Sequence, residues 1–197
     1  YLYKDILQWE YIKKSDKLLK LLKAIAYQLG NQVSFNELGK LIGIDNQTVE
    51  KYLLLLEQTF IIFRLPSLNR NLRTELKKSR KIYFHDNGIR NALINDFRLV
   101  EQRNDMGVLW ENYIISERYK HMRYSAWWTN SYFWRTHSQQ EIDYVEERNG
   151  KFYAYEFKWK SNINVKLPES FAKAYPHHTF KVVTPDNFED FILNDAS

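Results

Sequence analysis

The chain has 197 residues, with 29 Lys and Arg, 24 Asp and Glu, and no cysteine. Hydrophobic residues make up 44% of it, against six Gly and four Pro, which excludes intrinsic disorder and fibrous classes. Without cysteine there is no disulfide framework or thiolate zinc site, and a cytoplasmic location is expected. No apolar run approaches the roughly 20 residues that cross a bilayer, so no membrane association is expected.

The charge is unevenly distributed along the chain. Residues 1–98 carry a net charge of +7 and residues 99–197 a net charge of −2. Much of the excess lies in a basic segment, residues 64–81, where Glu75 is the single acid. This segment either neutralises nucleic-acid phosphates or forms a solvated hairpin that keeps the protein soluble. The residues expected to bind nucleic acid are Arg70, Arg73, Lys77, Lys78, Arg80 and Lys81.

Three helices are predicted in the first half. Apolar residues at helical spacing indicate the first helix, over residues 16–29. Ser34 and Glu37 form a capping-box pattern at the start of a short second helix, over residues 35–41. A third helix is predicted over residues 45–59. Because the chain starts inside what reads as a further helix, we expect it to be a fragment of a longer protein.

Two strands, over residues 61–65 and 82–84, follow and flank the basic segment. Three helices, a tight turn between the last two, and a hairpin are the order of a winged helix. The third helix carries a net charge of −2, which has the wrong sign for phosphate attraction. The winged helix is therefore interpreted as a packing or protein-docking unit, whose nucleic-acid contacts would come from the basic segment.

The second half has a different pattern. A helical segment near residues 88–94 and a polar stretch at 101–105 precede it. Its predicted elements are a helix over 108–121, strands over 126–134, 142–147, 152–160 and 179–183, and a helix over 168–175. Helix, antiparallel strands, helix and strand form an α/β or α+β pattern. We therefore predict a mixed α/β chain, α+β overall, with domains at residues 1–98 and 99–197.

One hairpin of the second half carries the candidate chemistry. Asn-Gly at residues 149–150 predicts a two-residue type I′ turn. In the register set by this turn, Asp143 lies opposite Glu156, and Glu141 lies opposite Lys158. Strict alternation would place six residues on one face of the sheet, namely Val145, Ala154, Asp143, Glu156, Glu141 and Lys158.

Directly opposed carboxylates destabilise a strand pair unless a positive charge lies between them. Asp143 and Glu156 are therefore candidate ligands of Mg²⁺, which prefers carboxylate oxygens and retained water. Lys158 would orient a water or stabilise negative charge on a phosphate. The alternative is that Glu141 neutralises Lys158 while both acids stay solvated on an exposed face.

The segments Glu141–Val145 and Tyr155–Lys158 resemble the Asp…Glu-x-Lys core of restriction-endonuclease-like nucleases, the PD-(D/E)XK superfamily. Residues 107–112 are similar to the first-helix segment of these nucleases, whose Glu often completes the site. Ile142 stands where the usual Pro would be. The resemblance implies a mixed sheet flanked by helices and Mg²⁺ as cofactor. The catalytic residues that it implies are Glu111, Asp143, Glu156 and Lys158.

Three segments of the first half, residues 1–7, 51–60 and 81–88, are similar to a C-terminal region of unassigned function in a large family of prokaryotic AAA-type ATPases. This resemblance implies an ATPase module ahead of Tyr1. The present residues contain no Walker A motif, so ATP would bind only to that module. The expected partners are nucleic acid and the AAA module, and an oligomer stays open.

Two functions follow from these observations. The first is a DNA-binding or docking module of a AAA-type ATPase with a nuclease-like fold. The alternative is an active Mg²⁺-dependent endonuclease that hydrolyses phosphodiester bonds. An aromatic run either stacks on bases or fills a core or an interface. That run comprises Trp127, Trp128, Tyr132, Phe133 and Trp134.

Overall fold

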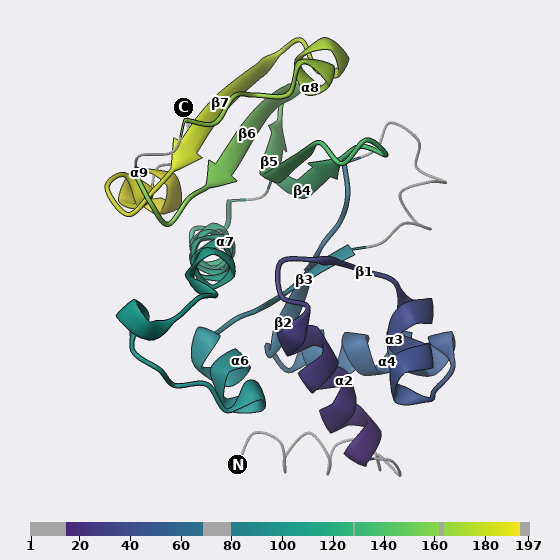
Figure 1. Ribbon diagram of the computed structural model, residues 1–197. Helices are drawn as coiled ribbons and strands as arrows, with labels where there is room; N and C mark the ends of the chain where they lie inside the picture. The colour runs from purple at the N-terminus through teal and green to yellow at the C-terminus, as the bar shows by residue number, and fades with distance from the viewer. Residues whose placement is uncertain (1–14, 69–79, 128, 162–163, 194–197) are drawn as a thin grey trace.

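The computed structural model describes residues 15–68, 80–127, 129–161 and 164–193, and it is mixed α/β, with two sheets and their helices (Figure 1). The elements of the first half are α2 (Ser15–Tyr27), β1 (Gln32–Val33), α3 (Phe35–Ile42), α4 (Asn46–Gln58), β2 (Ile62–Leu65), β3 (Arg80–Phe84) and α6 (Asn87–Ile94). Those of the second half are η1 (Val100–Gln102), α7 (Met106–Tyr124), β4 (Asn130–Arg135), β5 (Glu141–Arg148), β6 (Lys151–Phe157), α8 (Glu169–Ala174), β7 (His178–Val183) and α9 (Phe188–Leu193). Within these ranges, none of the helices has both the length and the apolar character needed to span a lipid bilayer.

Local capping explains where α3 begins and ends and where α4 begins. The Ser34 hydroxyl accepts a hydrogen bond from the Glu37 backbone, and the Glu37 carboxylate accepts one from the Ser34 N–H, so the predicted capping box is confirmed. Gly43 ends α3 with a φ of 69°, a left-handed conformation that favours glycine. Asp45 then caps α4 by accepting from the Thr48 N–H at 2.8 Å.

A three-stranded antiparallel sheet follows, in the order β1-β3-β2. The predicted pairing of the two strands that flank the basic segment is confirmed, with Phe63 opposite Tyr83 and Leu65 opposite Lys81. The two-residue strand β1 was not expected from the sequence. Because β3 is central, its side chains lie next to both neighbouring strands, while β2 forms an edge of the sheet.

The second sheet has four strands in the order β4-β5-β6-β7. The first three are antiparallel neighbours, and β7 lies parallel to β6 after the connection that contains α8. Asn149 and Gly150 have φ angles of 50° and 76°, as a type I′ turn requires, and Arg148 pairs with Lys151. The predicted register is confirmed from Tyr144 opposite Tyr155 to the turn.

The long helix α7 lies between the two sheets (Figure 1). One continuous hydrophobic core includes residues from α2, the small sheet, α7 and the larger sheet, so it crosses the predicted limit between residues 98 and 99. A smaller cluster of buried residues packs beside α8 and includes Val145, Ala154 and Phe171. Side chains of the first half are thereby held against the strands that carry the candidate acidic residues.

Candidate functional site

Glu111 comes from the second turn of α7, and its neighbour fixes that turn against β3. The Asn112 amide accepts a hydrogen bond from the Phe84 N–H at 2.8 Å and donates one to the Phe84 carbonyl at 3.0 Å. This clamp brings β3 side chains to Glu111. Glu111 Oε1 accepts hydrogen bonds from Lys81 Nζ at 3.0 Å and from the Tyr83 hydroxyl at 2.6 Å. A residue pair on α7 therefore joins the small sheet to the acidic cluster.

Lys81 lies inside this cluster. Its side chain is 2% exposed, and its Nζ is 3.0 Å from Glu111 Oε1 and 2.6 Å from Glu141 Oε1. Burial lowers the pKa of Lys81, but the carboxylates of Glu111, Asp143 and Glu141 outweigh that effect, so the pKa is raised. The expectation that Lys81 contacts nucleic acid is corrected, because its ammonium is buried against carboxylates instead.

Asp143 and Glu156 provide the two acids of the neighbouring strands. Asp143 Oδ2 accepts from the Phe157 N–H at 2.9 Å, and Glu156 Oε1 accepts from Lys158 Nζ at 2.8 Å. Burial, and then the Glu111 charge, raise the pKa of Asp143 to about 6. Burial and the Asp143 charge likewise raise the pKa of Glu156. The two acids therefore interact unfavourably when both are ionised.

The structure brings the four predicted catalytic residues into one cluster. Lys158 interacts electrostatically with Glu156, Asp143 and Glu111, and these interactions raise its pKa although burial opposes them. The side chains of Glu111, Glu156 and Lys158 are 13%, 14% and 28% exposed, so solvent reaches the cluster. Glu141 does not neutralise Lys158; its carboxylate pairs with Lys81 and, at 3.4 Å, with Arg135.

A β-bulge in β5 changes the predicted arrangement of side chains. Tyr132 pairs with Val145 and Trp134 pairs with Ile142, so β5 contains one more residue than β4 over this stretch. As a result, Ile142 and Val145 both lie in the small cluster beside α8. Glu141 instead contacts Lys81. The prediction that six residues alternate onto one face is therefore wrong, because the extra residue shifts the alternation.

Of the basic segment, the structure describes residues 64–68, 80 and 81. Arg70, Arg73, Lys77 and Lys78 lie outside the described residues. Arg80 is half-buried, and its guanidinium carbon lies 5.9 Å from the centre of the Phe35 ring. With Lys81 in the acidic cluster, the nucleic-acid contacts expected from the basic segment rest on the remaining five residues.

The acidic cluster does not fit Mg²⁺ in its present arrangement. Among the described residues, no group of three or more His, Cys, Asp or Glu side chains could hold a metal ion. The carboxylates already have protein partners: Lys81 and Tyr83 for Glu111, and Lys158 for Glu156. Two ammonium groups and a hydroxyl thus satisfy the oxygens that a metal ion and its bound water would otherwise use.

Asp143→Asn is expected to flatten part of the pH dependence of stability. The folded-state pKa of about 6 lies above the ordinary 3.8, so the folded state keeps a proton that the unfolded state releases. This carboxyl therefore lowers stability as pH rises from about 4 to about 6. At pH 7 the variant should gain on the order of 1–3 kcal/mol relative to wild type. Urea unfolding between pH 4 and 8 measures the free energy of unfolding of both proteins. The same dependence of this free energy on pH in wild type and variant would contradict the prediction.

The fold and the acidic cluster define a mixed α/β protein whose two halves meet at α7. The chain belongs to the family described as a domain of unknown function, DUF8612, whose family model matches residues 1–99. A second model, the domain of unknown function DUF4143, matches residues 106–195.

Two curated relatives are similar to this chain. They are the uncharacterized proteins Rv2008c of Mycobacterium tuberculosis and Mb2031c of Mycobacterium bovis. Each is 27% identical over 143 residues, which is 72% of this chain and 32% of the relative. The matched region thus spans about a third of the length of these relatives. No solved structure matches the chain.

Proposed function

We propose that the chain is a nucleic-acid docking module of a AAA-type ATPase, with a nuclease-like acidic cluster that serves structure and binding. One observation carries the proposal. Lys81 of β3, buried between Glu111 and Glu141, supplies from within the protein the positive charge that a divalent ion would supply. Because Lys81 compensates the negative charge of the carboxylates, the cluster keeps its shape without a metal ion. Cleavage through metal-bound water is therefore not its expected activity.

The link to a AAA-type ATPase rests on the resemblance of residues 1–7, 51–60 and 81–88 described above. It is supported by the length of the curated relatives, of which the match covers 32%. In this proposal ATP hydrolysis belongs to a separate module, and the present chain positions that module on its substrate. Nucleic acid is the proposed substrate because of the positive charge in residues 64–81.

The docking proposal predicts salt-sensitive DNA binding that depends on the basic segment. Replacing Arg70, Arg73, Lys77 and Lys78 by Gln is expected to weaken duplex binding by tenfold or more at low salt, because up to about four phosphate contacts are lost. The slope of log K against the logarithm of the salt concentration should become shallower by up to about 3–4. Fluorescence anisotropy across a salt series measures both quantities.

A matched control removes four positive charges elsewhere. Its substitutions to Gln are at the exposed Lys20, Lys23, Lys151 and Lys173. It has the same net charge as the test variant, so a specific surface is distinguished from a general charge effect. Equal weakening in the two variants would contradict docking through the basic segment. No binding by wild type at low salt would point to a protein partner instead.

The second candidate is the Mg²⁺-dependent endonuclease. It is favoured by the raised pKa values of Asp143 and Glu156, two acids beside Lys158 whose negative charges are incompletely compensated. The same purified protein tests it in a plasmid-nicking assay with Mg²⁺ or Mn²⁺. Nicking by wild type that is lost in Lys158→Ala would support the endonuclease. Binding without nicking would support docking.

A further inference from the structure

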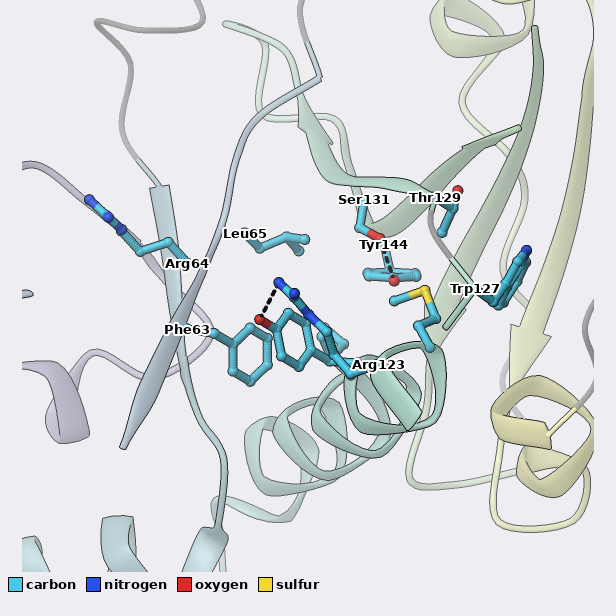
Figure 2. Close-up of a pocket in the computed structure, with 11 residues that line it drawn as sticks. Phe63, Arg64, Leu65, Arg123, Trp127, Thr129, Ser131 and Tyr144 are labelled. Atoms are coloured by element: carbon cyan, nitrogen blue, oxygen red, sulfur yellow. Dashed lines mark hydrogen bonds between the residues drawn. The ribbon is translucent and has the colours of Figure 1, made fainter. Parts of the chain in front are cut away.

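A pocket of about 190 Å³ lies away from the acidic cluster, between β2, α7 and the start of β4 (Figure 2). Phe63 and Leu65 of β2 form one wall, and Arg123 extends from α7 toward the centre. Thr129 and Ser131 lie on the opposite side. None of its lining residues belongs to the acidic cluster of Glu111, Asp143, Glu156 and Lys158.

The pocket exists because two sheet edges meet and then separate. The Phe133 N–H donates to the Pro66 carbonyl at 2.9 Å, and the Phe133 carbonyl accepts from the Leu68 N–H at 2.7 Å, which forms a parallel bridge to Ser67. Continuing this parallel ladder would require the N–H of residue 66 to donate to the Ser131 carbonyl. Proline has no N–H, so the ladder stops and the edges diverge.

Backbone groups therefore line both sides of the gap. The Ile61 carbonyl accepts from the His85 N–H toward β3, and alternation along β2 directs the N–H and C=O of Arg64 to the opposite edge. The Arg64 side chain points away from the pocket and pairs with Glu57. On the other side, Ser131 shares the orientation of Phe133, whose N–H and C=O face the first half.

The remaining walls are aromatic, and their charge is positive. Phe63 and Tyr119 stack with ring centres 4.7 Å apart, and Trp127 lines the far side. The exposed Arg123 donates to the Tyr119 hydroxyl at 2.9 Å, with its guanidinium carbon 5.0 Å from that ring centre. Among the residues that the structure describes, those that line the pocket include no Asp or Glu. Phe63 is itself buried against Tyr83 and Tyr119. Tyr119, beneath the Arg123 guanidinium, and Trp127 are therefore the rings that a flat occupant would contact, with an attached anion at Arg123.

We infer that the pocket takes one unstacked base of a single-stranded nucleic acid, with the adjacent phosphate near Arg123. Its volume is close to the ~150 Å³ of a cavity that holds one benzene ring, so it matches the size of a single ring rather than of a whole nucleotide. The outward backbone groups of Ser131 and Arg64 match the hydrogen-bonding edge of a base. The hydroxyls of Thr129 and Ser131, in contrast, already bond to the Glu147 carbonyl and the Tyr144 hydroxyl, respectively. This inference rests on the proposed docking function and specifies single-stranded nucleic acid as the ligand.

The test compares two single strands of about 12 nucleotides that carry the same phosphates, one of thymidines and one of abasic residues. Wild type is expected to bind the thymidine strand about tenfold more tightly, because base–aromatic stacking contributes at this scale. Tyr119→Leu should abolish the preference. Tyr124→Leu, an exposed position on the same helix, should preserve it. Arg123→Gln, also exposed, should weaken binding of both strands and lower the salt slope by about 1.

Photocrosslinking locates the base directly. A strand containing 5-iodouracil is expected to form an adduct on Tyr119 or Trp127, identified by mass spectrometry. Equal binding of both strands, or adducts confined to other residues, would overturn the base pocket while leaving docking through the basic segment intact. If the protein binds neither single strand and does not bind duplex DNA, the proposed function itself is overturned. An extended peptide that binds in the gap while leaving both the thymidine preference and the adduct unchanged would also overturn the inference.

Discussion

Lys81→Met is expected to lower the free energy of unfolding by about 3 kcal/mol or more, because removing one partner leaves buried negative charge uncompensated. Glu111 would keep the Tyr83 hydroxyl, and Glu141 would keep Arg135, but neither acid would have a buried cation nearby. Urea unfolding at pH 7 measures the loss. The exposed Lys151→Met provides the control for removing a lysine, with an expected change within about 0.5 kcal/mol.

The same variant tests whether Lys81 takes the place of a divalent ion. Without its ammonium, Glu111, Glu141 and Asp143 lose the buried cation with which all three carboxylates interact. Mn²⁺ should then raise the unfolding midpoint of Lys81→Met by mass action and leave wild type unchanged. Adding Glu111→Gln should remove that response. Equal Mn²⁺ stabilisation of wild type and Lys81→Met would contradict the internal-cation interpretation, and a folded variant that ignores Mn²⁺ would do so as well.

Elements governed by local chemistry could be predicted from the sequence. The capping box of Ser34 and Glu37 and the left-handed stop at Gly43 depend on neighbouring residues alone, so α3 is confirmed. The hairpin is confirmed for the same reason, since Asn149 and Gly150 adopt the positive φ angles of a type I′ turn. These signals fix backbone conformation without reference to the rest of the fold.

Features that depend on distant partners could not be predicted. The bulge in β5 requires knowledge of how β4 pairs with it, and no residue of β5 marks the insertion. Lys81 is the last residue of the basic segment, so its sequence neighbours predict an exposed charge, yet its partner Glu111 lies 30 residues away. A signal was present, since Lys81 directly precedes the apolar residues 82–84, which are all buried. A lysine in such a strand needs a buried acid.

The pocket illustrates the same limit. Pro66 predicts the end of a strand, but the pocket follows only when Phe133 from the other sheet bonds to the Pro66 carbonyl. Phe133 and Trp134 of the aromatic run fill the core, whereas Trp127 lines the pocket. The sequence could not distinguish these roles, because both require aromatic residues. Trp128 lies outside the described residues.

Arg118→Met is expected to cost about 3–5 kcal/mol of folding free energy, the usual effect of breaking a buried ion pair from one side. Arg118 of α7 and Glu146 of β5 are 1% and 0% exposed, with Nε–Oε1 at 2.9 Å and Nη2–Oε2 at 3.2 Å. Arg118 also donates to the Ile192 carbonyl of α9 at 3.0 Å. One guanidinium thus joins the central helix to the larger sheet and to the last helix.

The double variant Arg118→Met/Glu146→Gln separates the effect of the lost charge from the effect of the lost side-chain packing. The amide oxygen introduced by Glu146→Gln would still accept from Arg148, which pairs with the Glu146 carboxylate in the wild type, but no buried carboxylate would be left undercompensated. The double variant should therefore recover part of the stability lost in Arg118→Met. Arg118→Lys should recover less, because an ammonium cannot reproduce the paired bonds of the guanidinium. Urea unfolding of the three variants decides between the two causes: equal losses in the single and double variants would mean that packing against Trp127 and Phe191, rather than charge, makes Arg118 important.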